Sequence, residues 1–536
     1  MTETYVAAAE AEDPLVLTID VGTSSARALV YDARGRTVRT WEVHRPYQVQ
    51  TRPGGGVEID ADQVFDLVVG CVDAILATAG AEAKRIAVIA ADTFWHSLMG
   101  VDERGRALTP VYTWADTRSR EAARELQQRL DQRAVHARTG AVLHSSYLPA
   151  KLLWLRQTDP HLVDRVKYWM SFAEYLYLRL FGERRVSLSM ASGTGLFDQN
   201  SCTWDEEVLS TLDLEREKLS PLAEFSESMS GLKGDLAGRW AALSDRPWYL
   251  PIGDGAANNI GSGSCSPEWV VAMIGTSGAI RVVQEAERPD IPWGLWTYRV
   301  DRRRFVQGGA LSDGGNVFAW LTKTLRLDAE EDLERELSQA PPDSHGLTVL
   351  PFLAGQRSPD WNIDARAAMV GMRLDTTPLD IARACLESVA YQFGVIYDIL
   401  KTVVPRPKGI IGSGAGLIHS PAWMQIMTDV LGEPMVASAV PEASSRGAAL
   451  LALEAMGAIS DLSTIPVPLG DEHQPQQKNT SAYRAAMDRQ KELYALLEGS
   501  RTARAGLGGA DEAGTRTDLA LDHPSRNAGR SRSPAS

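Results

Sequence analysis

Apolar residues along this chain alternate between a strand-like and a helix-like spacing. Residues 15–31 carry them at every second position on either side of a short break, which predicts two strands joined by a tight loop. Residues 84–93 predict a buried strand, whereas residues 119–140 and 378–403 have apolar positions at helical spacing, the latter after a proline. This alternation of strands and helices predicts an α/β fold.

The break between the first two strands has the composition of a phosphate-binding loop. The strand runs into Asp20, and the chain then turns through Gly22-Thr23-Ser24-Ser25. Glycine lets a phosphate approach the backbone, hydroxyls donate to its oxygens, and a carboxylate can address a metal ion. An ordinary β-hairpin has the same pattern, so this segment alone leaves both interpretations open.

A similar turn recurs in the second half of the chain. Residues 273–278, MIGTSG, follow one apolar strand and precede another, as residues 19–25, IDVGTSS, do. The repeat suggests two related domains that each direct a turn of backbone amides at one shared ligand. A chance match of so short a string is the alternative.

The length of 536 residues predicts two large domains. We place them at residues 14–253 and 254–497. Residues 1–13 are expected to form a disordered leader. Residues 498–536 have no aromatic residue and are rich in Gly, Ala, Ser and charge, which predicts a disordered tail.

Charge and composition exclude several classes of protein. The net charge of −14 argues against a general nucleic-acid surface. The acidic N-terminus does not have the pattern of a signal peptide, and the uncharged run 409–428 is too polar for a membrane span, so we expect neither nucleic acid nor membrane as a partner. Four scattered cysteines predict reduced thiols, no zinc site and a cytoplasmic location. The motifs of P-loop and Rossmann proteins are absent.

Several segments, taken in order, resemble the FGGY carbohydrate kinases. Residues 20–25, 274–278 and the glycine-rich segment before 421–425 resemble the three nucleotide elements of that family. Residues 92–119 resemble its sugar-binding segment, and the WADTR core of this segment is close to gluconokinases. Residues 350–372 resemble a further segment of its second domain. The resemblance extends from residue 14 to about residue 497.

The resemblance implies two actin-like, ribonuclease-H-like domains around a central cleft. It implies ATP and Mg²⁺ as cofactors and a small sugar or sugar acid as substrate, with D-gluconate to 6-phosphogluconate as the favoured reaction. A homodimer is the assembly that it suggests. A kinase for xylulose, ribulose, erythritol or glycerol is the alternative within the class. A non-catalytic actin-fold regulator and a chaperone-like ATPase are the alternatives outside it.

Three positions depart from the family pattern. Leu148 stands three positions before Lys151, where the family usually has Pro, Ser or Thr. Cys385 stands in the place of a small residue two positions before Glu387. Ala415-Gly416 replaces a pair of glycines in the expected adenine loop, which leaves the nucleotide preference open.

The resemblance also assigns roles to residues. Asp254, in a glycine-flanked loop after an apolar strand, would be the general base, although Asp-Gly often forms a simple turn. Asp20 would hold Mg²⁺ through water. The expected nucleotide contacts are Thr23, Ser24, Ser25, Gly275, Thr276, Ser277, Gly278, Gly309, Gly314, Asn316, Gly416 and Ser420. The expected sugar contacts are Trp95, His96, Trp114, Asp116, Arg118, Ser146 and Asp254.

Two interpretations of the WADTR segment remain open. If the segment is extended, Trp114, Asp116 and Arg118 face the same way and can line a sugar site, with Arg118 available to a substrate carboxylate. Otherwise Trp114 belongs to the core and Asp116–Arg118 is a local ion pair. His96 can likewise be a sugar ligand or a buried, hydrogen-bonded histidine.

Overall fold

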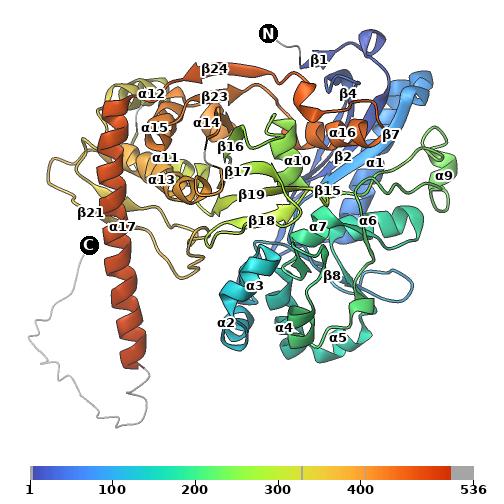
Figure 1. Ribbon diagram of the computed structural model, residues 1–536, viewed down its shortest axis with the longest axis horizontal. Coiled ribbons are helices and arrows are strands. Elements are labelled where there is room, and N and C mark those ends of the chain that lie inside the picture. Colours follow the sequence, from blue (N-terminus) through green and yellow to red (C-terminus); the bar gives the residue numbers. More distant parts are fainter. Residues whose placement is uncertain (1–3, 328–329, 405, 509–536) are drawn as a thin grey trace, which may run out of the picture. The chain divides into compact units, whose positions relative to one another are not determined.

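The computed structural model describes residues 4–327, 330–404 and 406–508 (Figure 1). Its first large sheet has the strand order β1-β4-β3-β2-β7-β15. Apolar residues fill the central strands, so that all of β2 is buried. The strands are β1 (Tyr5–Val6), β2 (Leu15–Val21), β3 (Ser25–Tyr31), β4 (Thr37–Pro46), β7 (Ile86–Thr93) and β15 (Ile252–Gly253).

The second large sheet repeats the plan of the first. Its order is β18-β19-β17-β16-β22-β23-β24. In both sheets an antiparallel meander is followed by two parallel strands, β4-β3-β2-β7-β15 in one and β19-β17-β16-β22-β23 in the other. The duplication suggested by the two turns is therefore present in the strand topology. The strands are β16 (Trp269–Ile274), β17 (Gly278–Glu285), β18 (Trp296–Arg299), β19 (Arg304–Leu311), β22 (Gly409–Ser413), β23 (Met435–Ser438) and β24 (Leu469–His473).

Helices cover both sheets. In the second sheet, α13 (Pro378–Leu400) packs on β17 and β19 and also contacts α15 (Pro421–Leu431). In the first, α1 (Ala61–Ala79) packs on β3 and β4. Among the described residues one helical stretch, Ala61–Arg85, has the length and composition of a membrane span, but its α1 part carries its apolar side chains into this core.

The boundary that we predicted at residue 254 does not separate the packing units cleanly. Helix α16 (Ala443–Ala455) comes late in the chain, yet it packs on β2 and β7 of the first sheet and on α10 (Asp254–Gly261) (Figure 1). Ala448, Ala449 and Leu450 of this helix are buried there. A helix from the second half of the chain therefore packs on the first sheet, on the strand that carries Asp20.

The predicted leader requires correction. Residues 4–13 are ordered: β1 pairs with β4 in parallel, and Arg85 donates to the carbonyls of Ala8 and Ala11 at 2.8 and 2.6 Å. The prediction missed this because the leader is short and its pairing partners are distant. Residues 1–3 and 509–536 of the predicted leader and tail lie outside the described residues.

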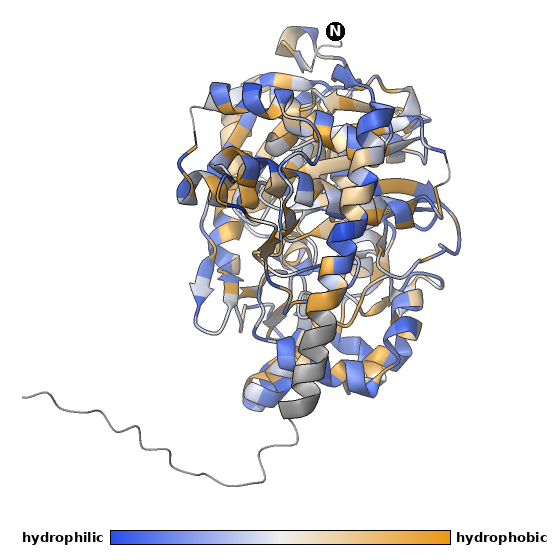
Figure 2. Ribbon diagram, turned by 90° about the vertical axis from the view of Figure 1, so that its left-hand side faces the viewer, coloured by the Kyte–Doolittle hydropathy of each residue, from blue (hydrophilic) through white to orange (hydrophobic). Residues whose placement is uncertain are grey.

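The structure describes residues 498–508 of the predicted tail as part of a helix. They continue α17 (Gln477–Gly508), because Ala, Arg and Leu in this stretch are good helix formers. From Lys491 onward the chain forms a unit of its own. Figure 2 shows hydrophilic and hydrophobic residues interspersed along the coloured part of α17. The four cysteines are free thiols, as predicted.

Candidate active site

The two glycine-containing turns join equivalent strands of the two sheets. In the first, the Gly22 amide donates to the Ser25 carbonyl at 3.0 Å, and in the second the Gly275 amide donates to the Ser277 carbonyl at 3.0 Å. Each turn has one exposed hydroxyl residue at its tip, Ser24 in one and Thr276 in the other. Both turns thus hold a tight backbone and present a hydroxyl, which is what a phosphate-binding role requires.

Two carboxylates lie side by side where β2 and β7 end. Asp20 and Asp92 are register partners in this parallel pair, so their side chains share one face of the sheet. Asp20 accepts hydrogen bonds from Arg27 Nη1 and from Ser445 Oγ of α16, both at 3.3 Å. Asp92 is fully buried and neither of its carboxylate oxygens has a hydrogen-bond partner. Burial and the charges of Asp20 and Asp254 raise the pKa of Asp92 well above its usual value.

The pair fits a hydrated divalent cation. Buried carboxylate oxygens without donors are stabilised by a cation, and Mg²⁺ keeps several waters when one or two carboxylates hold it. Within the described ranges, no three acidic, histidine or cysteine side chains form a metal site by themselves, so water or phosphate oxygens would have to supply further ligands. Sequence reasoning identified Asp20 but missed Asp92, although both interrupt an apolar strand in the same way.

Asp254 lies next to this pair. It is the first residue of α10 and follows β15, which pairs with β7 beside Asp92. The Gly255 amide donates to its Oδ1 at 2.8 Å. Burial raises the pKa of Asp254 to about 6, although the charge of Arg281 acts in the opposite direction. A carboxylate with such a pKa can accept a proton near neutral pH.

The glycines on either side of Asp254 have a packing role. A Cβ at position 253 would lie 1.8 Å from Cε2 of Trp95, and a Cβ at position 255 would lie 2.5 Å from Nη1 of Arg281. No larger residue fits at either position without displacing these side chains. The two glycines therefore let Trp95 and Arg281 approach the backbone on either side of Asp254, which goes beyond the simple turn considered from sequence.

His96 sits in a strained conformation among aromatic rings. Its φ is 60°, and its Nδ1 contacts the Gly193 carbonyl at 2.5 Å, which requires the proton on Nδ1. Burial, followed by the charge of Arg357, lowers the pKa of His96 to about 3. The ring is neutral, so its Nε2 is an acceptor suited to a sugar hydroxyl. Tyr298 and Tyr147 pack edge-on against it, with their hydroxyls 2.6 Å apart.

The WADTR segment is a turn and not an extended strand. The Asp116 amide donates to the Thr113 carbonyl at 3.2 Å, so Trp114, Asp116 and Arg118 do not face the same way as predicted. Arg118 pairs with Asp116 at 2.5 Å and with Glu58 at 2.9 Å, which is the ion-pair interpretation left open above. Burial opposes the charge on Arg118, but its bonds to Asp116 outweigh this and raise its pKa.

We predict that Arg118→Ala lowers the free energy of unfolding by about 3 kcal/mol, because it leaves the buried Asp116 without its cation, whereas Glu58 keeps its pair with Arg52. Chemical denaturation measures this change. The ratio of activities on charged and neutral acceptors should stay as in the wild type. A selective loss on sugar acids without loss of stability would instead support Arg118 as a substrate ligand.

Other predicted sugar contacts lie near an unpredicted cation. Trp114 is partly exposed, and the guanidinium carbon of Arg357 lies 5.3 Å from its ring centroid and 5.6 Å from that of Trp361. Ser146 is buried, and its hydroxyl lies 3.2 Å from His144 Nδ1. His144 in turn packs edge-on against Trp361. Sequence reasoning quoted the segment containing Arg357 and Trp361 but gave neither residue a role.

A cavity of about 930 Å³ opens beside the second turn. Its apolar wall includes Phe318, Leu333, Leu386 and Trp423, which suits a flat base. Ser420 caps α15 and donates to Glu334 at 2.8 Å. Of the predicted nucleotide contacts, the cavity is lined by Gly275, Thr276, Asn316, Gly416 and Ser420.

The remaining predicted nucleotide contacts lie elsewhere. Thr23, Ser24 and Ser25 belong to the first turn, and Ser277 to the second. Gly278 and Gly314 lie close together, since a Cβ on Gly314 would be 3.1 Å from the Gly278 nitrogen. Gly309, another of the predicted nucleotide contacts, lies inside β19, where a Cβ would be 2.5 Å from Ile396. It packs the sheet against α13, so we withdraw it as a nucleotide contact.

The chain matches known proteins over most of its length. Residues 15–261 match the N-terminal domain of the FGGY family of carbohydrate kinases, and residues 270–456 match its C-terminal domain. A gluconokinase of Bacillus subtilis is 28% identical over 500 residues, 91% of this chain and 97% of that protein. A xylulose kinase of Lactococcus lactis is 26% identical, covering 89% of this chain and 96% of that protein.

Solved structures agree with these matches. A gluconate kinase from Lactobacillus acidophilus superposes with a TM-score of 0.83 at 27% identity, covering 90% of this chain and 98% of that one. A xylulose kinase from the same organism gives the same TM-score at 26% identity, covering 91% and 99%. The predicted two-domain, actin-like fold is therefore confirmed, and the chain belongs to the FGGY family of carbohydrate kinases.

Proposed function

We propose that this carbohydrate kinase transfers the γ-phosphoryl group of ATP to a sugar acid, D-gluconate, to form 6-phosphogluconate. The observation that carries the proposal is Asp254, a carboxylate with a raised pKa. It lies beside the pair Asp20 and Asp92 on one side and beside Trp95 on the other. The gluconokinase relatives support gluconate, but xylulose kinases match nearly as well. A ketopentose or polyol is therefore the competing acceptor.

Different residues of this chain have separate roles in the proposed reaction. The apolar cavity holds the nucleotide base, and the two turns bind its phosphates through amides and hydroxyls. Asp20 and Asp92 would hold Mg²⁺, which would supply positive charge to the transferring phosphates. Asp254 accepts the proton of the substrate's terminal hydroxyl as that oxygen bonds to the γ-phosphorus and the bond to ADP breaks. His96 accepts a hydrogen bond from another hydroxyl of the substrate and so fixes the position of the sugar's carbon chain.

Exclusion of water is the remaining requirement, because water could replace the sugar as acceptor. The buried His96, Trp95 and Tyr298 form an apolar surround on the sugar side. A dry site also strengthens every charge interaction within it. We further propose that the enzyme works in the cytoplasm, without nucleic-acid or membrane partners, and as a homodimer.

An ADP-release assay across acceptors tests the proposed function. With ATP and Mg²⁺, gluconate should give the highest kcat/KM among gluconate, xylulose, ribulose, glycerol and erythritol. A higher value for xylulose or ribulose would make the protein a ketopentose kinase. ADP release that no acceptor stimulates would favour the non-catalytic regulator.

A further inference from the structure

Arg281 is a buried cation with almost no bonding partners. It lies on β17 and is 5% exposed. Its hydrogen bond within the described residues is a long one, from Nη2 to Asn258 Oδ1 at 3.4 Å, and its Nε has no acceptor. No acidic side chain in the described part of the chain reaches ion-pair distance. The comparably buried Arg299 and Arg446 instead donate to several backbone carbonyls each.

An unpaired buried guanidinium is costly, so its retention calls for a ligand. Removing a charge from water is unfavourable unless a partner of opposite charge replaces the lost hydration. Burial does lower the pKa of Arg281, but only to about 10, so the group stays charged at neutral pH. The structure thus maintains a permanent positive charge that has one long hydrogen bond and no ion pair among the described residues.

The surrounding residues make room for this side chain. Arg281 pairs across the sheet with Gly308, where a Cβ would lie 2.8 Å from its Cα and 3.0 Å from its Cγ. On the other side Gly255 leaves space for Nη1. Two glycines on different elements therefore leave space for the arginine. Its guanidinium lies beside Gly255, the residue that follows the base Asp254.

The position of Arg281 is on the sugar side of the site. A Cβ on Gly255 would touch both Nη1 of Arg281 and Cζ3 of Trp95, at 2.5 and 2.7 Å, so the guanidinium and the indole ring are neighbours. Trp95 packs on Tyr298 with ring centroids 4.9 Å apart. These rings belong to the cluster around His96. The nucleotide cavity is not lined by Arg281.

We propose that Arg281 binds the carboxylate of the substrate and so selects a sugar acid over a neutral sugar. This inference rests on the proposed function. A guanidinium binds a carboxylate through two parallel hydrogen bonds, which supply both the missing charge and acceptors for the free donors. A neutral polyol of the same length offers only hydroxyls and brings no counter-charge to the guanidinium. Arg118, the cation suggested by sequence, is already occupied by Asp116 and Glu58.

Arg357 is the competing anchor. It lacks an ion pair in the described residues, and its Nε has no acceptor. However, its guanidinium lies over the rings of Trp114 and Trp361, which already stabilise a cation. We therefore assign it to the wall of the sugar site, where it contributes to acid and neutral acceptors alike.

The test compares gluconate with glucitol, the neutral polyol of the same length. Arg281→Met should raise KM for gluconate about 100-fold, the usual scale for losing a hydrogen-bonded charge pair, and should change kcat/KM for glucitol less than threefold. Arg281→Lys keeps the charge but cannot form two parallel hydrogen bonds, so its KM for gluconate should rise about tenfold, between the wild type and Arg281→Met. Isothermal titration of gluconate without ATP should show the same order of Kd values.

Arg357→Met is the matched control and should weaken both acceptors to a similar extent. If it produces the selective loss and Arg281→Met does not, the anchor is Arg357 and our assignment is wrong. Equal loss of kcat on gluconate and glucitol in Arg281→Met would make Arg281 an aid to phosphoryl transfer and overturn the carboxylate role. If the wild type binds gluconate without phosphorylating it, the proposed function fails, and the Kd series still decides the anchor.

Discussion

Replacing Asp254 with asparagine should lower kcat on the best acceptor at least about a hundredfold, while the protein stays folded and still binds ATP. Asparagine has nearly the same size and keeps an acceptor for the Gly255 amide, but it cannot take a proton. A general base typically contributes a factor of about 10² to 10⁴ in rate. Steady-state kinetics with ADP-release detection measures the loss, and nucleotide titration checks binding.

A second carboxylate variant controls for the loss of a buried acid as such. Glu174→Gln removes a buried carboxyl of the capping box of α6 (Phe172–Phe181), whose pKa is also raised by burial. It should leave kcat within a factor of about two. If Asp254→Asn turns over at a near-normal rate, Asp254 is not the base.

The pH profile gives a separate mark of the same residue. Asp254 must be ionised to accept a proton, and its pKa is about 6. The value of kcat/KM should therefore reach a plateau well above pH 6, and well below pH 6 it should fall tenfold per pH unit. The residual rate of Asp254→Asn should lose this acid limb.

Local patterns were sufficient to predict the parts of the site that depend on local backbone geometry. Both turns, the strands around them and Asp254 follow from short segments whose apolar spacing and glycines determine a conformation within a few residues. The repeated turn even indicated the duplication of the sheets. These features need no knowledge of distant contacts.

Features that depend on distant partners were not predictable in this way. The ion pair of Arg118 requires Glu58, 60 positions away, and Asp92 becomes part of the site only because β7 pairs in register with β2. The sequence around Gly309 suits a loop, but the residue lies inside β19, where it packs against α13. Arg281 was visible as a charge within an apolar strand, and only the tertiary structure shows that it has no partner.

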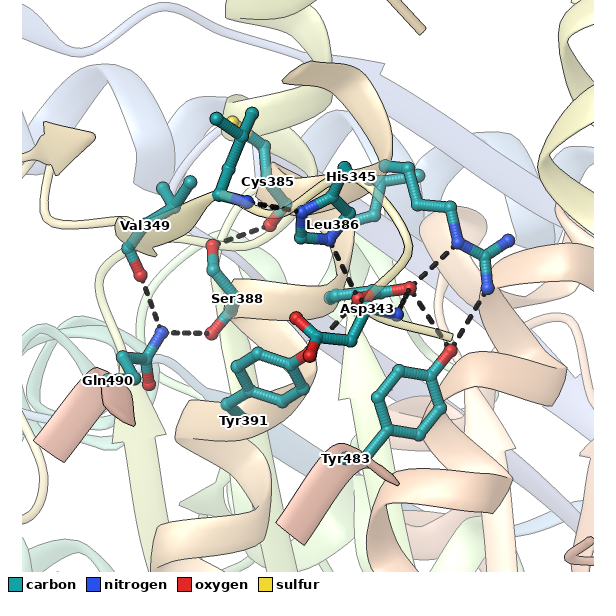
Figure 3. A network of polar contacts seen from close by, with 12 residues as sticks. Asp343, His345, Val349, Cys385, Leu386, Ser388, Tyr391, Tyr483 and Gln490 are labelled. Carbon is teal, nitrogen blue, oxygen red and sulfur yellow. Dashed lines mark hydrogen bonds and ion pairs between the residues drawn. The ribbon is translucent and has the colours of Figure 1, made fainter. Parts of the chain in front are cut away.

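A buried network in the second half of the chain carries the largest predicted effect on stability. Glu387 of α13 is fully buried and accepts hydrogen bonds from Arg383 Nε at 2.7 Å, Tyr391 Oη at 2.9 Å and His345 Nε2 at 3.0 Å (Figure 3). Tyr483 Oη adds another at 3.2 Å. Burial alone would raise the pKa of Glu387, but the bond from His345 and the charge of Arg383 outweigh it and lower the pKa.

Glu387→Gln should lower the free energy of unfolding by about 3–5 kcal/mol, the usual cost of breaking a buried ion pair from one side. The amide would direct its NH₂ at groups that are themselves donors, and it would leave the buried Arg383 without a counter-charge. Urea denaturation followed by tryptophan fluorescence measures the change.

The same residue should make stability depend on pH with a defined sign. Because the pKa of Glu387 is lower in the folded state, its contribution is complete above the unfolded pKa, near 4.3, and is lost as the pH falls through the folded value. Glu387→Gln should therefore lose part of the wild type's stability gain between acid and neutral pH. Glu121→Gln, which breaks an exposed pair with Arg124, is the matched control and should cost less than about 1 kcal/mol. An equally small cost for Glu387→Gln would mean that the donors to Glu387 find other acceptors and that the network does not hold α13 in place.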